Sequence, residues 1–118
     1  MSRRILVVDD EYDLLHAICG FLEDEGFEVQ PCSSGEEALS LLKSGEVPDL
    51  VLLDVMMPGL SGFEVAERIH ALDQTRDLPV IMMSAVTPKQ TEGSWQAFLR
   101  KPFDIDNLLA TIGRWAGT

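Results

Sequence analysis

Cysteine is scarce in this sequence, and the two cysteines do not form a recognisable metal or redox motif. Cys19 and Cys32 are not a CxxC pair and do not belong to a cluster with histidine. Structural zinc sites and thioredoxin-like chemistry require such groupings, so we expect neither here. Free thiols are typical of a reducing compartment.

Positive charge is also scarce. Nine lysine and arginine residues are set against twenty aspartate and glutamate residues, which gives a net charge of −11. Nucleic acid binding depends on lysine and arginine side chains that neutralise phosphates. We therefore expect no direct nucleic acid binding by this chain.

Long hydrophobic runs are missing as well. No stretch approaches the roughly 20 apolar residues that a membrane-spanning helix needs. Only four apolar residues separate the basic residues 1–4 from Asp9, too few for the core of a signal peptide. We expect a cytoplasmic protein without membrane insertion, with residues 1–118 forming a single domain around one core.

Short apolar runs do occur, and they alternate with helical patterns in the way that is typical of βα units and a parallel sheet. The third and fourth runs are nearly continuous in apolar residues, as in strands buried on both faces. Right-handed crossovers between five such strands predict an α/β fold, a doubly wound sheet of the flavodoxin-like order 2-1-3-4-5. The predicted strands are Ile5–Val8, Phe27–Val29, Leu50–Leu53, Val80–Met83 and Ala97–Leu99.

Apolar residues recur at helical spacing in four other segments, each of which is predicted to be an amphipathic helix. Ser34, with Glu37 three residues later, is typical of a capping box at the start of the second helix. Gly26 and Gly45 follow the first two helices, where glycine is favoured. The apolar positions are Leu14, Leu15, Ile18 and Leu22; Ala38, Leu39 and Leu42; Val65, Ala66, Ile69 and Leu72; and Ile105, Leu108, Leu109 and Ile112.

The crossover between the fourth and fifth strands has little room for a helix. Thr87 could cap a helix with Pro88 in its first turn, but Gly93 ends the pattern after about Glu92. A helix of one or two turns is marginal without tertiary packing. We therefore expect the fourth helix of the fold to be shortened or degenerate.

Polar residues follow four of the predicted strands. Asp9 and Asp10 follow the first strand, Asp54 the third and Ser84 the fourth, and Lys101 lies just beyond the fifth. Ligands of doubly wound sheets bind beyond the carboxyl ends of the strands, so we expect these side chains to share one crevice.

Each of these residues also has a simpler explanation. Asp10 and Asp13 could cap the first helix, and Asp54 could open a turn. Ser84 could be an ordinary bonded hydroxyl, and the lysine–proline pair could form a surface turn. Caps and turns give no reason for three acids, a hydroxyl and a lysine to fall at the same end of four strands, so we favour a shared site.

Three carboxylates in one crevice repel one another unless a cation offsets their charge. Oxygen ligands select a hard ion such as Mg²⁺, which binds one or two carboxylates together with phosphate oxygens. A lysine in the same pocket suits a phosphoryl group. Because a carboxylate can itself form an aspartyl phosphate, Asp54 on the third strand is the candidate nucleophile.

From residue 3 to residue 116 the sequence resembles the response regulator receiver domain, the phospho-acceptor module of two-component signalling. The resemblance lies in ILVVDDE (5–11), PDLVLLDVMMPGLSG (48–62), VIMMSA (80–85) and FLRKPF (98–103). It implies a signalling switch that catalyses only its own phosphorylation and dephosphorylation. A histidine kinase or histidine phosphotransfer protein would phosphorylate Asp54, and a downstream protein or output domain would respond.

The resemblance also implies how the metal is held. Asp10, Asp54 and the backbone carbonyl of Met56 would ligate Mg²⁺ directly, and Asp9 would act partly through water.

Further roles follow for the phosphoryl group and the switch. Lys101 would contact one phosphoryl oxygen and Ser84 another, while Phe98 would be the aromatic switch residue that turns inward as Ser84 moves. The bond between Lys101 and Pro102 is expected to be cis. Since the interval from Ser84 to Lys101 is shorter than usual in this family, we expect a remodelled output surface. Phosphorylation would change the order of residues 85–96, with Trp95 as a reporter.

Three other functions share parts of this pattern. A dehalogenase-like phosphohydrolase has a second acid two residues after its nucleophile, where this chain has Met56. A flavin-binding electron carrier has a Ser/Thr/Gly-rich phosphate loop after the first strand, where residues 9–11 are acidic. The third alternative is a degenerate receiver used only for docking, although its acidic pocket is complete.

Overall fold

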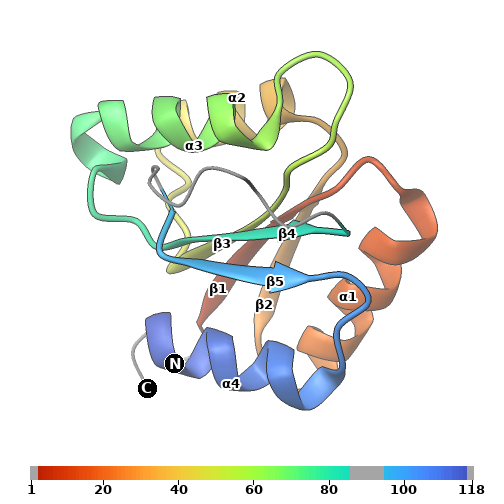
Figure 1. Cartoon of the computed structure of the whole chain (residues 1–118). Coiled ribbons are helices and arrows are strands. Elements are labelled where there is room, and N and C mark those ends of the chain that lie inside the picture. The colour runs from red at the N-terminus through yellow and green to blue at the C-terminus, as the bar shows by residue number, and fades with distance from the viewer. Residues whose placement is uncertain (1–2, 86–94, 117–118) are drawn as a thin grey trace.

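Five parallel strands form one sheet in the order β2-β1-β3-β4-β5, seen edge-on between the helices in Figure 1. The structure is a computed structural model and describes residues 3–85 and 95–116. The predicted strand order is confirmed. The strands are β1 (Arg4–Val8), β2 (Glu28–Cys32), β3 (Leu50–Asp54), β4 (Val80–Ser84) and β5 (Ala97–Arg100).

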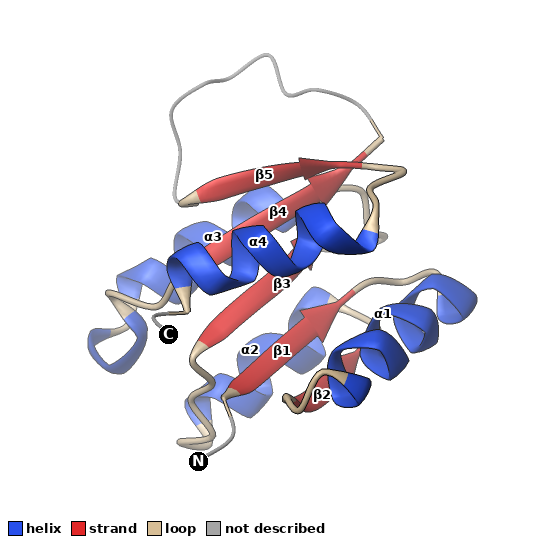
Figure 2. Cartoon of the chain, turned by 90° about the horizontal axis from the view of Figure 1, so that it is seen from below, coloured by secondary structure: helices blue, strands red, loops and turns tan. Residues whose placement is uncertain are grey.

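Helices cover both faces of the sheet: α2 and α3 lie on one face, and α1 and α4 on the other (Figures 1 and 2). The four predicted helices are confirmed, while the short helix expected at residues 87–92 lies outside the described residues. No helix in the described part of the chain is long and apolar enough to cross a membrane. The helices are α1 (Tyr12–Asp24), α2 (Gly35–Lys43), α3 (Gly62–Ala71) and α4 (Ile105–Trp115), with a short 3₁₀ helix, η1 (Asp73–Thr75), after α3.

Alternate residues of the strands build two hydrophobic layers. In β1, Leu6 and Val8 belong to the layer under α2 and α3, whereas Ile5 and Val7 belong to the layer under α1 and α4. All four side chains are buried. Because both faces are covered, a central strand can be apolar at every position, which explains the continuous runs in the sequence.

The position of β2 was predicted less well than that of any other strand. The predicted strand Phe27–Val29 is replaced by Glu28–Cys32. β2 lies at the edge of the sheet, alternates between more and less exposed residues, and contains Pro31, which edge strands tolerate because they need fewer backbone donors. A search for apolar runs therefore misses the polar half of this strand.

Side-chain caps mark the starts of α2 and α3. The Ser34 hydroxyl accepts the N–H of Glu37 at 3.1 Å, as predicted. The Glu37 carboxylate, however, accepts a hydrogen bond from the Ser33 hydroxyl at 3.4 Å. A complete capping box instead starts α3, where Ser61 and Glu64 cap each other's backbone N–H groups.

The helix ends also follow the sequence pattern closely. Gly26 and Gly45 have φ angles of 94° and 98°, a left-handed conformation that costs glycine little. The third helix ends one residue before the predicted pattern does, because Leu72 is its extended C-terminal cap.

Candidate functional site

Two buried acids and a lysine meet at the carboxyl edge of the sheet. Lys101 Nζ lies 2.9 Å from Asp9 Oδ2 and 3.2 Å from Asp54 Oδ1. Asp9 is 0% and Asp54 3% exposed, and 13% of the Lys101 side chain is exposed. The lysine is therefore the cation that allows two buried carboxylates to lie side by side.

Asp10 completes a cluster of three acids with Asp9 and Asp54. One carboxylate oxygen from each residue lies within 4.8 Å of the other two. Asp10 is exposed, so the cluster opens to solvent on its side. Three hard oxygen donors that are partly open to water form a donor set suited to a small divalent cation.

The turn after β1 explains how Asp9 stays buried. Its N–H donates to the carbonyl of Cys32 at 3.1 Å, and its Oδ1 accepts the N–H of Glu11 at 2.9 Å. Glu11 is the N-cap of α1 and makes no side-chain cap. Asp10 therefore does not cap this helix, whereas Asp13, the other acid of that alternative, does lie in its first turn.

The electrostatics of the site act on Asp54 and Lys101. The pKa of Asp54 is raised to about 6: burial is the largest cause, repulsion by Asp9 and Asp10 also raises it, and Lys101 opposes the rise. Burial alone would lower the pKa of Lys101, but its hydrogen bond to Asp9 and the attraction of both buried acids leave that pKa raised. At neutral pH the site therefore holds an ionised Asp54 and a protonated Lys101.

Glu11 is an acid near the site for which the sequence pattern predicts no separate role. Its Oε1 lies 3.8 Å from Lys101 Nζ, and 68% of its side chain is exposed. Its position directly after Asp9 and Asp10 in the sequence was the feature that could have indicated a place near the site. Because the Glu11 carboxylate is largely exposed, solvent screens its pairing with Lys101, and Glu11 mainly adds negative charge at the mouth of the site.

Met56 lies two residues after Asp54, in the loop between β3 and α3. The residue is 70% exposed. The base of the loop is closed by the N–H of Gly62, which donates to the carbonyl of Val55 at 2.9 Å. A Cβ atom on Gly62 would lie 2.4 Å from the carbonyl oxygen of Asp54, so only glycine lets α3 start this close to the acid.

Ser84 and Phe98 lie on the two strands beyond β3. Ser84 ends β4 and is buried, and its carbonyl accepts the N–H of Lys101 at 2.8 Å. Phe98 is opposite Met82 in the β4–β5 pairing and is partly buried against the layer under α2 and α3. The bond between Lys101 and Pro102 is cis, as expected. The movement of Ser84 and Phe98 on phosphorylation stays a prediction.

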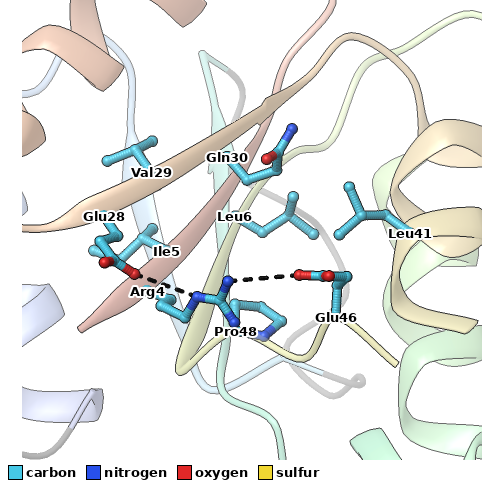
Figure 3. Close-up of a pocket in the computed structure, with 9 residues that line it drawn as sticks. All are labelled: Arg4, Ile5, Leu6, Glu28, Val29, Gln30, Leu41, Glu46 and Pro48. Carbon is cyan, nitrogen blue, oxygen red and sulfur yellow. Dashed lines mark hydrogen bonds and ion pairs between the residues drawn. The ribbon is translucent and has the colours of Figure 1, made fainter. Parts of the chain in front are cut away.

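A pocket of about 100 Å³ is found away from this site, beside the first residues of β1 and β2 (Figure 3). Leu6 and Leu41 are among its lining residues, and Arg4 forms ion pairs there with Glu28 at 3.4 Å and Glu46 at 3.5 Å. Arg4 is already paired with two acids in this pocket, so we place the candidate site at the carboxyl ends of the strands and not here.

Comparison with known proteins agrees with the geometry of the site. The sequence model of the response regulator receiver domain matches residues 5–113. The chain is 35% identical over 117 residues to the phosphate regulon transcriptional regulatory protein PhoB of Escherichia coli, a match that covers 95% of this chain and 51% of PhoB. The chain thus spans about half the length of this relative. Protein PilH of Pseudomonas aeruginosa is 33% identical over 115 residues, with 92% of this chain and 93% of PilH covered.

Solved structures give the same result. The response regulator TrrA of Thermotoga maritima, in complex with Mg²⁺-BeF, has a TM-score of 0.86 and 35% identity, with 96% of this chain and 98% of TrrA covered. A CheY-like receiver domain protein of Methanospirillum hungatei has a TM-score of 0.90 and 27% identity, with 98% and 94% covered. The chain belongs to the response regulator receiver domain family.

Proposed function

We propose that residues 1–118 form a phosphorylation-dependent signalling switch in which Asp54 accepts a phosphoryl group. The observation that carries the proposal is a buried carboxylate, 3.2 Å from a lysine, in a cluster with two further acids. Its donor would be a histidine kinase or histidine phosphotransfer protein, as for receiver domains in general. The domain acts on no other substrate and catalyses only its own phosphorylation and dephosphorylation.

Asp54 has the properties that a nucleophile at this position needs. With a pKa of about 6 it is mostly ionised at pH 7 to 8 and remains more basic than an ordinary carboxylate. One of its oxygens forms the new bond to phosphorus, while the bond from phosphorus to the donor histidine nitrogen breaks. Lys101 would then donate a hydrogen bond to a phosphoryl oxygen in place of one of its present hydrogen bonds to the carboxylates.

The donor set fits Mg²⁺. Asp10, Asp54 and the backbone carbonyl of Met56 would ligate the ion, with Asp9 acting partly through water. When bound there, such an ion would supply positive charge that offsets the charge on the phosphoryl oxygens. The chain itself supplies the pre-set positions of the acids, since Asp9 is fixed by its bond to the N–H of Glu11.

Phosphorylation changes the surface beyond β4 and β5. Ser84 would hydrogen-bond the phosphoryl group, and Phe98 would turn inward. We propose that residues 85–96 become more or less structurally ordered at the same time; most of these residues lie outside the described part of the chain. Trp95 is a suitable reporter because its ring lies 5.2 Å from that of Phe63 in α3. The changed surface would regulate a downstream protein or output domain in the cytoplasm.

Mass spectrometry tests the proposal directly. The protein is incubated with acetyl phosphate and Mg²⁺, and its intact mass is compared with that of Asp54→Ala. A matched control is Asp106→Ala, which removes an exposed acid in α4. One phosphoryl adduct on wild type and control, absent from Asp54→Ala, supports the switch. An adduct that persists in Asp54→Ala contradicts it, and no adduct on any protein favours a docking module.

A further inference from the structure

The loop between β3 and α3, residues 55–61, carries the Met56 carbonyl of the proposed metal site. Its base is fixed on both sides: the Val55 N–H donates to the Met83 carbonyl, and the Gly62 N–H donates to the Val55 carbonyl, each at 2.9 Å. The side chains of Met57 and Leu60 pack against the hydrophobic layer under α2 and α3. These contacts hold the ends and the apolar side of the loop.

The first turn of α2 holds the far end of the same loop. Glu36 Oε1 accepts the N–H of Leu60 at 3.1 Å, across 24 residues of sequence. Gly59 has a φ of +77°, and a Cβ atom there would lie 2.9 Å from Glu36 Oε1. A Cβ atom on Gly35 would lie 3.4 Å from Leu60 Cβ. The loop therefore approaches Glu36 closely at Gly59, and Leu60 lies at van der Waals distance from Gly35.

We infer that Glu36 is a positioning residue that fixes the β3–α3 loop through Leu60 and thereby sets the direction of the Met56 carbonyl. The inference rests on the proposed function, in which that carbonyl binds Mg²⁺. A carbonyl has no side-chain torsion of its own, so its direction depends on the loop backbone alone. Mg²⁺ accepts only near-ideal octahedral geometry, so a loop that must first be ordered binds the ion less tightly.

Glu36 could also act without touching the loop. Its charge could attract the metal through space, or it could stabilise the first turn of α2, where acids are favoured. Glu36→Gln separates these effects, since glutamine keeps an oxygen acceptor for the Leu60 N–H but lacks the charge. Glu37→Ala removes one negative charge at the neighbouring position and leaves the Glu36–Leu60 contact intact.

Calorimetric titration with MgCl₂ measures the effect on the metal. We expect Glu36→Ala to weaken Mg²⁺ binding by about five-fold, the loss of one hydrogen bond that holds a ligand in place. Glu36→Gln and Glu37→Ala should stay within about two-fold of wild type because both keep an acceptor for Leu60. Equal affinity in Glu36→Ala and wild type would falsify the inference, and so would equal losses in the Ala and Gln variants.

Amide hydrogen exchange of Leu60 in metal-free protein tests the contact without the metal. The exchange should be faster in Glu36→Ala than in wild type and nearly unchanged in Glu36→Gln. Gly59→Ala disturbs the same contact from the loop side and serves if Glu36→Ala folds poorly. Unchanged Leu60 exchange in both variants overturns the inference. If wild type binds no Mg²⁺, the proposed function fails, while the exchange result still decides whether Glu36 holds the loop.

Discussion

At the scale of single residues, Asp54 occupies surroundings that oppose its charge. Burial and two neighbouring acids raise its pKa from 3.8 to about 6, even though Lys101 is in contact with it. This difference corresponds to roughly 3 kcal/mol of destabilisation when the group is ionised. The carboxylate that we propose as the phosphoryl acceptor thus reduces the stability of the metal-free fold.

Asp54→Asn should therefore stabilise the metal-free protein at alkaline pH. The folded state holds the Asp54 proton more tightly than the unfolded state, so ionisation destabilises the fold progressively from about pH 4 to pH 6, and the effect is constant above that range. Asparagine cannot ionise, so the substitution removes this destabilisation. We expect a gain of roughly 1–3 kcal/mol in the free energy of unfolding at pH 8 and about half of that at pH 5, measured with urea in EDTA. A gain that is equal at both pH values, or that also occurs in Asp106→Asn, would contradict this explanation.

Lys101 places its positive charge inside the acid cluster, where it would compete electrostatically with a metal ion. Lys101→Met keeps most of the side-chain length and removes the charge. We expect Mg²⁺ to bind roughly three- to ten-fold more tightly, because the acids lose their internal counter-ion. Phosphorylation of Asp54 should nevertheless slow, because no lysine meets the phosphoryl oxygens.

Calorimetry and intact-mass time courses measure the two effects on Lys101→Met separately. The matched control is Arg100→Met, which removes the exposed cation at the end of β5, directly before Lys101. It should change neither the Mg²⁺ affinity nor the phosphorylation rate much. Weaker Mg²⁺ binding in Lys101→Met would show that the lysine supports the metal site rather than competing with it.

At the scale of elements, Gln96 joins the start of β5 to β4 through two hydrogen bonds with Val80. The backbone N–H of Gln96 donates to the Val80 carbonyl at 2.8 Å, and its side-chain Oε1 accepts the Val80 N–H at 2.7 Å. Both backbone groups of Val80 are thus satisfied just before the register Ile81↔Ala97 begins. Because Lys101 directly follows β5, this contact also helps to place the lysine.

Gln96→Ala should loosen the attachment of β5. It removes the acceptor for the Val80 N–H, which then lacks a partner in a partly buried position. We expect a loss of about 1–2 kcal/mol in the free energy of unfolding, measured by urea denaturation. Gln96→Glu retains an oxygen acceptor and should lose much less. Equal losses in the two variants would indicate that the hydrogen bond is not the cause.

Most of the fold and of the site could be predicted because both follow from local patterns. The acids of Asp9 and Asp54 were identifiable because each directly follows an apolar run, and parallel strands bring such positions to one edge. The contacts from Glu36 to Leu60 and from Gln96 to Val80 could not be predicted. They join residues far apart in sequence, and polar side chains at those positions are ordinary for an exposed helix turn and a strand start.

At the scale of the whole molecule, negative charge exceeds positive charge by 11. Such an excess favours the expanded state through self-repulsion, and any cation reduces this by screening. Three of the acids are also gathered at one site, at Asp9, Asp10 and Asp54. Cations should therefore stabilise the fold in two ways, one general and one dependent on the site.

Thermal unfolding in NaCl and MgCl₂ at equal ionic strength separates the two contributions. Mg²⁺ at about 100 times its Kd should stabilise the folded state by about 2.7 kcal/mol beyond screening, which raises Tm by roughly 10 °C. Asp10→Asn removes a proposed ligand that is exposed in the free protein, so the fold should persist while the extra rise is lost. If NaCl and MgCl₂ raise Tm equally in wild type, screening accounts for the whole effect and the acid cluster holds no ion. If Asp10→Asn keeps the extra rise, the ion binds elsewhere on the acidic surface, because a site that depends on three converging carboxylates cannot lose one without losing affinity.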